Sequence, residues 1–500
     1  MLLLNLDFKI MKQTIISLVT LFTFMVSCSD FEELNQNPNE PTGVGADVLL
    51  TNAIRNSVQI TSNEAFLISN NVAQLTGKAL RLEVDNYKWN AFPTLWEGLY
   101  ESLTDVEAAL ALAKEADNSA MQGALMVLKS WIYSQLTNAY GDIPYTEAIK
   151  GGLAAEPDLT PKYDTQESIY ASLLGDLETA GGLLSSGGSI SGDVLYNGDA
   201  QKWIKFSNAL RLRLLMYKSN KENVAAEFKS IVDNQPLFAS NDDQAALTFL
   251  RAFPNEFPTL PLKSGDFIAV AFSESALNAF NQYNDPRLSR YARPNADANG
   301  DRDYANPTFT GITNGVVSEG ALLGVAYYDF IGDATATEMG IDYAQGLLMT
   351  YAEQELLLAE AAHNGWITND EETHYKNGIQ ASHDYYQVNY APFGYTDFDD
   401  FYINSGVALD EKMDIWEQKW LSLYFTAMDP YFEVRRMYVT AGGFDGIRFL
   451  KEPYGTNFNN KELPLRFLYP FQEQSLNESN YNAAKSQYDG INGKMWILSD

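Results

Sequence analysis

The chain has 500 residues, of which 46% are hydrophobic and 13% aromatic, and its formal net charge is −31. This composition is typical of a folded globular protein and excludes a largely disordered chain. The strong negative charge argues against nucleic acid and anionic membrane surfaces as partners, since both are bound through clustered Lys and Arg side chains. A neutral or cationic ligand fits the charge better.

The first 27 residues predict a lipoprotein signal peptide. Lys9 and Lys12 precede a hydrophobic run over residues 15–26 that is too short to span a bilayer as a mature helix. Cys28 is the only cysteine, and a lone thiol at this position is explained by acylation and not by a disulfide. A plain signal peptide cut elsewhere is the alternative, and either Met1 or Met11 can be the initiator.

Residues 28–45 carry Asn, Pro and Gly without a helical period and predict a tether. The remaining residues, 46–500, are expected to form a single domain. Apolar residues at three- and four-residue steps predict helices in its first half, over residues 48–61, 64–80, 92–116, 123–140, 164–184, 201–218 and 222–233.

The helix that starts near residue 123 is expected to organise the domain. It is hydrophobic most of the way round, which indicates an interior helix, and it ends at a tight turn with Gly141 and Pro144. Residues 78–91 break the helical pattern and predict a loop. Asp164 and Glu167 resemble a capping box that opens the helix over 164–184.

The second half predicts a loop-rich insertion followed by further helices. Gly, Pro, Asn, Asp and Tyr dominate residues 236–342, where only residues 271–282 indicate a helix, and long ordered loops often form binding surfaces. Further helices are expected over residues 343–364, 371–388, 410–427 and 430–440. Helix pairs of this kind suggest tetratricopeptide-like units that stack into a scaffold, although the full repeat signature is absent.

Two loop stretches combine aromatic rings with amide, carboxylate and guanidinium groups, the mixture that stacks on sugar rings and reads their hydroxyls. The first contains Arg81, Asp85, Tyr87, Trp89 and Asn90. The second contains Tyr283, Asn284, Arg287, Tyr291, Arg293, Tyr304, Tyr327 and Tyr328. We expect these residues to form a ligand platform. The alternative is that the aromatic residues pack loops onto helices, and that Asp285 and Arg287 are structural residues on either side of Pro286.

Metal binding and catalysis have less support. Asn295, Asp297, Asn299 and Asp301 have the oxygen spacing of a calcium loop, but Asn306 occupies the position of the usual bidentate acid. A structural calcium ion and a solvated acidic turn both remain open, and no other cofactor is expected. His363, His374 and His383 lack zinc-site spacing, and no nucleophile-elbow or phosphate-loop pattern occurs, so we expect no enzyme. Glu353, Glu355 and Glu360 are expected on a solvated helix face or paired with Arg435 or Arg436.

Several segments together carry a resemblance to a known family. They are NQNPN (35–39), YGDIPY (140–145), DPRL (285–288), YAEQELLLAEA (351–361), EQKW (417–420) with EVRR (433–436), and LRFLYP (465–470). In this order, after a lipoprotein signal, they resemble the SusD/RagB family of Bacteroidetes surface lipoproteins. The C-terminal residues 494–498 depart from the more polar, Trp-rich ending of the family.

The resemblance implies a mainly α fold in which tetratricopeptide-like helix pairs form a right-handed scaffold with an irregular, loop-rich ligand-binding face. It implies a cell-surface lipoprotein of the outer membrane that captures oligosaccharide and delivers it to a SusC-like TonB-dependent barrel. Some family members take peptides, so a peptide is an alternative cargo. Two further functions stay open: a secreted glycoside hydrolase of helical fold, and a scaffold whose only partner is the barrel.

Overall fold

The computed structural model describes residues 44–499 apart from 151–158, 251–252, 260–261, 263, 319, 322, 324–344, 369 and 489. The predicted signal peptide, Cys28 and nearly all of the tether lie outside the described residues. Ala46–Asp500 forms one compact unit. Within the described ranges, every helix is too short or too polar to cross a membrane.

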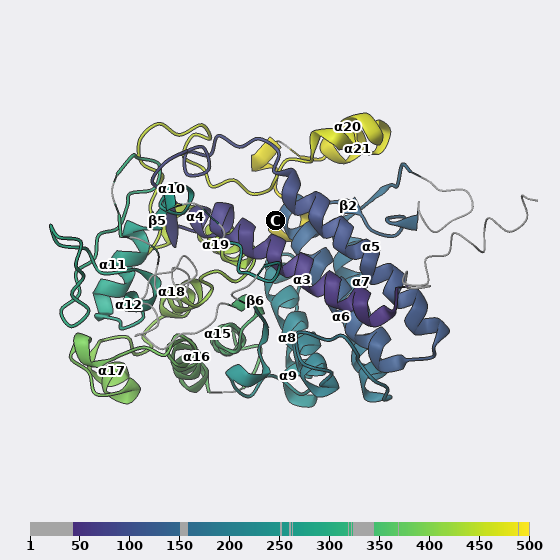
Figure 1. Ribbon diagram of the computed structural model, residues 1–500, viewed down its shortest axis with the longest axis horizontal. Helices are drawn as coiled ribbons and strands as arrows, with labels where there is room; N and C mark the ends of the chain where they lie inside the picture. Colours follow the sequence, from purple (N-terminus) through teal and green to yellow (C-terminus); the bar gives the residue numbers. More distant parts are fainter. Residues whose placement is uncertain are drawn as a thin grey trace, which may run out of the picture. The chain divides into compact units, whose positions relative to one another are not determined.

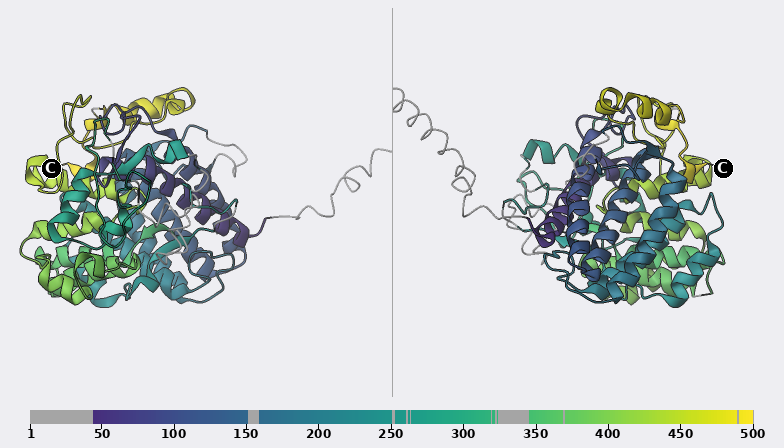
Figure 2. Two further views of the ribbon diagram at one scale, coloured as in Figure 1. Left: turned by 60° about the vertical axis from the view of Figure 1, so that its left-hand side comes forward. Right: turned by 90° about the vertical axis from the view of Figure 1, so that its right-hand side faces the viewer.

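The first half of this unit is a series of long helices, each packed on its neighbour (Figure 1). They are α3 (Ala46–Glu64), α5 (Pro93–Glu115), α6 (Ser119–Tyr140), α7 (Gln166–Ser185), α8 (Ala200–Lys218) and α9 (Ala225–Asn234). α3 packs on α5, α5 on α6, α6 on α7 and α7 on α8, and Figure 2 shows these helices side by side. Stacking of sequential helices is how helical repeats bury their apolar faces. The mainly helical prediction is therefore confirmed.

The second half adds shorter helices around a further packed group, in which α15 contacts α16, α18 and α8. The α-helices are α10 (Ser264–Phe267), α11 (Glu274–Tyr283), α12 (Leu288–Tyr291), α15 (Tyr351–His363), α16 (Glu371–Tyr385), α17 (Phe398–Asn404), α18 (Lys412–Ser422), α19 (Asp429–Ala441), α20 (Phe471–Leu476) and α21 (Glu478–Lys485). The 3₁₀ turns are η3 (Asn241–Asp243), η5 (Ala391–Phe393), η6 (Phe444–Gly446), η7 (Gly490–Asn492) and η8 (Trp496–Leu498).

Among the described residues, three short strand pairs are antiparallel, and two of them join segments that are distant in the sequence. β1 (Thr76–Lys78) pairs with β5 (Val270–Phe272), with Thr76 opposite Phe272. β2 (Ile143–Pro144) pairs with β3 (Tyr163–Asp164). β4 (Ala245–Thr248) pairs with β6 (Gln345–Met349), with a register shift at Ala245/Ala246.

The structure corrects three local predictions. Residues 64–80 are not a separate helix, because α3 continues through the π-helix η1 (Ala65–Ser69) and α4 (Asn70–Val72) before β1 begins. Residues 345–349 form β6 and not a helix, since an apolar run of this length does not distinguish a buried strand from a helix. The predicted capping box of Asp164 and Glu167 is wrong, because Thr165 caps α7 by accepting the Ser168 N–H. The Asp164 carboxylate instead accepts the N–H groups of Tyr145 and Thr146, which follow β2.

α6 is the interior helix that the sequence predicts. All its residues are buried except Ser119, Gln122, Met126 and Lys129, which follow one narrow stripe. It ends at Gly141, whose φ of 85° favours glycine, and a Cβ there would lie 2.5 Å from the Tyr488 hydroxyl. Arg466 donates to the Tyr140 carbonyl at 2.7 Å, and Tyr469 donates to the Asp142 carbonyl at 2.6 Å. The C-terminal segment therefore fixes this turn.

Buried ion pairs hold α15 to the surrounding helices. Glu360, fully buried, accepts from Arg436 of α19 at 2.8 Å and from Lys419 of α18. Burial alone would raise the pKa of Glu360, but the charges of Arg436 and Lys419 hold it well below the ordinary range. Glu353 pairs with Arg213 of α8, which also lies 3.1 Å from Asp429. The expected pairing of Glu360 with Arg436 is confirmed, whereas the expected solvated face is wrong.

We predict that Glu360→Ala destabilises the protein strongly. The substitution leaves Arg436 and Lys419 buried with only Glu433 as a counter-charge, so the free energy of unfolding should fall by about 3–5 kcal/mol. Urea unfolding monitored by circular dichroism measures this change. Glu227→Ala, at an exposed position of α9, is the control and should stay within about 0.5 kcal/mol of wild type. A loss below about 1 kcal/mol for Glu360→Ala would mean that the network does not stabilise the fold.

Glu64, the last residue of α3, provides a pH-dependent test. It is 3% exposed, and burial raises its pKa to about 7, against weaker opposing effects of the Asn63 amide and the Lys78 charge. Between about pH 4.5 and 7 the folded protein therefore keeps a proton that the unfolded chain releases. The free energy of unfolding should decrease as the pH rises through this window.

We expect Glu64→Gln to remove this decrease, because glutamine does not ionise. Relative to wild type, the variant should gain about 2–3 kcal/mol between pH 4.5 and 7.5. Urea unfolding at both pH values measures it, with Glu101→Gln on the exposed side of α5 as the control that shows no such gain. A pH-independent difference between Glu64→Gln and wild type would contradict the assignment.

Candidate functional site

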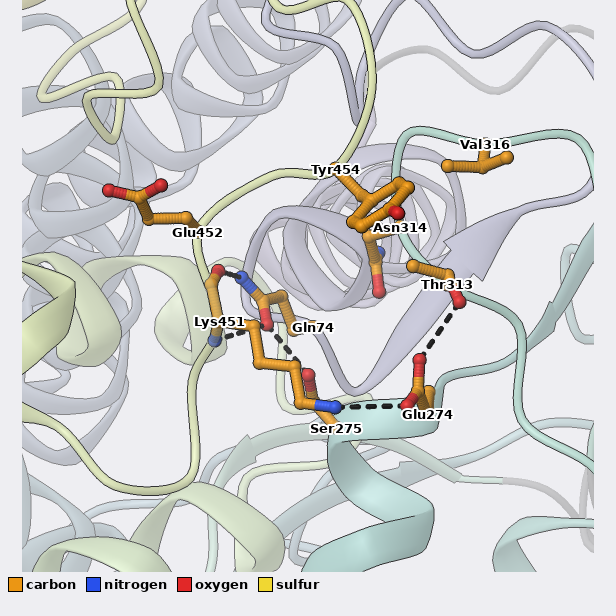
Figure 3. A pocket seen from close by; sticks show the side chains of 9 residues that line it. All are labelled: Gln74, Glu274, Ser275, Thr313, Asn314, Val316, Lys451, Glu452 and Tyr454. Carbon is orange, nitrogen blue, oxygen red and sulfur yellow. Dashed lines mark hydrogen bonds and ion pairs between the residues drawn. The ribbon is translucent and has the colours of Figure 1, made fainter.

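A cavity of about 480 Å³ lies where the end of the first helix, the start of α11 and two loops meet. We call it the Tyr454 pocket. Five of its nine lining residues come from the loop-rich insertion, which the sequence predicts as the binding region. Figure 3 shows the side chains of these nine residues.

Gln74 joins three segments at the base of the Tyr454 pocket. It follows α4 with a φ of 57° and is 3% exposed. Its amide oxygen accepts from the Ser275 hydroxyl at 2.8 Å and from the Lys451 N–H at 3.0 Å, and its amide nitrogen donates to the Lys451 carbonyl at 2.6 Å (Figure 3). This amide therefore fixes the start of α11 and the 451–454 loop relative to the first helix.

Glu274, the first residue of α11, supplies one of the two carboxylates of the pocket. Its carboxylate accepts from the Lys451 ammonium group at 2.9 Å and from the Thr313 hydroxyl at 2.8 Å (Figure 3). These two hydrogen bonds, that of Lys451 first, lower the pKa of Glu274. Ser273 caps α11 by accepting the Ala276 N–H. The pocket therefore presents an ionised carboxylate whose charge is balanced by a lysine.

Asn314 and Gly315 position the opposite wall. The Asn314 amide donates to the Thr76 carbonyl at 2.9 Å and to the Asp85 carboxylate at 3.2 Å. Burial raises the pKa of Asp85 to about 6, although the Lys78 N–H, the Lys78 charge, the Gly315 N–H and the Asn314 amide oppose this shift. Gly315 has a φ of 87°, and a Cβ there would lie 2.7 Å from the Tyr454 carbonyl oxygen. Only glycine allows this close approach of the two loops.

Tyr454 provides an exposed aromatic ring at this wall, with 66% of the residue accessible to solvent. The other lining groups are two hydroxyls, two amides, an ion pair, the Glu452 carboxylate and the Val316 side chain, and several of the polar groups are hydrogen-bonded to one another. A flat ring beside fixed polar groups can stack on the C–H face of a sugar while the polar groups bind hydroxyls. The arrangement suits recognition of a neutral polar ligand.

Most aromatic residues of the predicted platform are buried. Tyr87 and Trp89 are 3% and 8% exposed, and Trp89 packs against Phe92, Tyr431 and Phe467 while its indole N–H donates to the Val84 carbonyl. Arg81 and Asn90 of the same loop are exposed but do not line the cavity. Their contact with ligand stays a prediction, whereas the burial of Tyr87 and Trp89 corrects the expected platform.

The second stretch is buried in the same way. Arg287 and Tyr291 are inaccessible to solvent, and Arg287 pairs with Asp285 at 2.6 Å, as the structural alternative predicts. Tyr283 is 5% exposed and donates to Glu417. Arg293 is 3% exposed. A ligand cannot reach these side chains in this structure because helices α15, α16 and α18 and their loops cover them.

The other predicted residues of that stretch differ in their placement. Asn284 is exposed, in a left-handed conformation that ends α11, and its amide donates to the Phe393 carbonyl at 2.6 Å. Tyr304 is half-buried. Tyr327 and Tyr328 lie outside the described residues.

The candidate calcium loop is exposed and closes on itself. One Asp297 carboxylate oxygen accepts the N–H groups of Asn299 and Asp301, at 2.8 and 3.0 Å. These hydrogen bonds, from Asn299 first, lower the pKa of Asp297. Asn295 donates to the Thr310 hydroxyl. Among the described residues no group of three or more His, Cys, Asp or Glu is arranged to hold a metal ion. Calcium binding stays a prediction.

Sequence reasoning singled out none of the nine residues that line the pocket, although five of them lie in the loop-rich insertion. They come from segments up to about 380 residues apart, and only the fold brings them together. One local signal was present, since residues 452–460 (EPYGTNFNN) combine aromatic, amide and carboxylate side chains, as the two stretches of the predicted platform do.

The chain is similar to proteins of one known family. Residues 38–470 match the family profile SusD-like, described as starch-binding and associating with the outer membrane. A SusD homologue from Bacteroides fragilis is similar in structure, with 25% identity and a TM-score of 0.72 over 91% of this chain and all of the other. No curated protein matches the chain.

Two further solved structures cover 91% of this chain and all of their own, each with 26% identity and a TM-score of 0.72. One is described as a chitin-binding protein, and the other is an outer-membrane protein of Bacteroides vulgatus described as involved in nutrient binding. The family match extends over most of the chain. This protein therefore belongs to the SusD/RagB family of nutrient-binding proteins that associate with the outer membrane.

Proposed function

We propose that this protein is a cell-surface lipoprotein that captures oligosaccharide in the Tyr454 pocket and delivers it to a SusC-like TonB-dependent barrel in the outer membrane. The observation that carries the binding step is the exposed Tyr454 ring beside the hydrogen-bonded group of Gln74, Glu274 and Lys451. Membership of a family that associates with the outer membrane supports the location and the partner.

The ligand that fits this pocket is a neutral glycan. Within the lining, Lys451 is paired with Glu274, and Glu452 is paired with Lys461 outside the lining at 3.2 Å. An acidic sugar would therefore find no unpaired cation in the lining, whereas neutral hydroxyls can donate to the carboxylates. Because one similar structure is described as chitin-binding, oligomers of N-acetylglucosamine are the first neutral probe to use.

Binding without turnover fits the pocket better than glycoside hydrolysis. A glycosidase needs one carboxylic acid with a raised pKa to protonate the leaving group. The hydrogen bonds of Lys451 and Thr313 lower the pKa of Glu274 instead, and the Glu452 side chain points away from Glu274 in Figure 3. An assay for new reducing ends on the bound glycan tests this alternative.

We predict that Tyr454→Ala weakens glycan binding about 5- to 30-fold, because loss of the ring removes stacking worth about 1–2 kcal/mol. A glycan array identifies the ligands, and isothermal titration then measures the affinity of the strongest one. Phe471→Ala is the matched control, since Phe471 is also 66% exposed but does not line the pocket.

The control should bind as wild type does. Equal affinity of wild type and Tyr454→Ala for every glycan on the array would place the capture site elsewhere. Binding of peptides but of no glycan would favour the peptide cargo that some family members take.

The anchor has its own test. If Cys28 is acylated, expression in a Bacteroidetes host with an alkyne-tagged fatty acid should label the mature protein, and Cys28→Ala should abolish the label. Protease digestion of intact cells, read by immunoblot, should remove the labelled protein if it faces outward. An unlabelled wild-type protein, or label that persists in Cys28→Ala, would rule out this anchor.

A further inference from the structure

A second polar cavity, of about 300 Å³, lies between the segment of η3 and one face of α16, beside the first residue of α15. We call it the Tyr351 pocket. It shares no residue with the Tyr454 pocket. The Tyr351 pocket is lined from the η3 segment, α15 and α16, whereas the Tyr454 pocket is lined from the start of α11 and from loops.

The α16 face of this cavity follows from helical spacing. Asn377, Gln380 and Asp384 are three and four residues apart, so their side chains lie along one side of the helix. Asn377 is held in place because its amide donates to the Glu355 carboxylate of α15 at 3.2 Å. The α16 wall of the cavity therefore carries the amides of Asn377 and Gln380 and the carboxylate of Asp384 in one row.

The η3 segment forms the facing wall and is firmly attached. The Asn241 amide donates to the Ala381 carbonyl of α16 at 2.9 Å. The Asp243 carboxylate accepts the Ala239 N–H at 2.8 Å and pairs with Lys205 at 2.7 Å. In the described part of the chain, the buried Oδ1 atom of Asn241 has no hydrogen-bond partner. These contacts hold the η3 segment against α16.

Tyr351 supplies the aromatic side of the cavity. It is half-buried, and burial, then the charges of Glu355 and Asp243, raise its pKa to about 12. Its hydroxyl therefore stays protonated at physiological pH and can donate. The Tyr351 pocket therefore combines an aromatic ring with amides and carboxylates, as the Tyr454 pocket does. The two pockets are lined by different residues.

The charge of the lining restricts the ligand. Among the described residues that line the cavity none is Lys, Arg or His, while Asp242 and Asp384 are both present. Lys202 donates to the backbone carbonyl of Asp242 at 2.7 Å but is not part of the lining. A uronic acid or a sulfated sugar would therefore meet two carboxylates and no cation in the lining, whereas the hydroxyls of a neutral sugar can donate to these carboxylates.

We propose that the Tyr351 pocket is a second carbohydrate-binding site, which accepts a neutral sugar unit through Tyr351, the amides of Asn377 and Gln380, and the carboxylate of Asp384. The inference goes beyond capture at the Tyr454 pocket and does not depend on it. Two sites on one protein can hold two segments of the same polysaccharide, which raises retention on a polymer above that of either site alone.

The experiment compares four proteins on an array of neutral and uronate-containing glycans: wild type, Tyr454→Ala, Tyr454→Ala with Gln380→Ala and Asp384→Asn, and Tyr454→Ala with Asp233→Asn. Gln380 and Asp384 are exposed, so their replacement should leave the fold intact, and thermal melts check this. Asp233, exposed on α9 and paired with Lys229 at 2.6 Å, is the charge-matched control.

We expect Tyr454→Ala to retain binding to at least one neutral glycan and to no uronate. The two α16 substitutions should lower this retained binding at least tenfold, and the Asp233→Asn control should not change it. Retained binding that the α16 substitutions leave unchanged would overturn the proposal, as would a Tyr454→Ala protein that binds no glycan. If wild type and Tyr454→Ala bind every glycan equally well, the proposal that the Tyr454 pocket captures glycan is wrong. Loss of binding in the protein with the two α16 substitutions would still support the second site.

Discussion

The structure depends on the need to pair charges that are buried inside a helical protein. Glu353 and Glu360 lie seven residues apart on α15 and hold Arg213 of α8 and Arg436 of α19. Unpaired, each of these groups would cost several kcal/mol. α18 joins the network through Lys419, and its Glu417 binds Arg448 at 2.6 Å. Arg448 begins the segment that carries Lys451 and Tyr454, so the ion pairs of the core set the position of the candidate binding loop.

The Tyr454 pocket is consequently a preorganised surface. Gln74 fixes two backbone groups of Lys451, and Gly315 allows the 313–316 loop to lie against Tyr454. Because these contacts exist before any ligand arrives, little side-chain freedom remains to be lost on binding. The Lys451 ammonium group also neutralises the Glu274 carboxylate. Such a site is better suited to holding a neutral polymer than to moving protons, which agrees with a family named for binding.

Helix positions could be predicted well because their signals are local. The period of Leu99, Leu103 and Val106 and the N-terminal Pro93 predicted α5 within a residue or two. The platform could not be predicted, because aromatic residues in loops have the same pattern whether they face solvent or pack inward. Trp89 and Tyr291 pack inward. Tyr454 and Gln74 meet across the whole chain, which no local pattern reports, although five of the nine lining residues lie in the insertion of residues 236–342.

The central claim is that a glycan binds at the Tyr454 pocket, and a crystal structure with the strongest array ligand tests it most directly. The account predicts a sugar ring stacked on Tyr454, with hydroxyls within hydrogen-bond distance of the Glu274 carboxylate or the Asn314 amide. A complex in which the Tyr454 pocket is empty while the same glycan occupies another surface would contradict it.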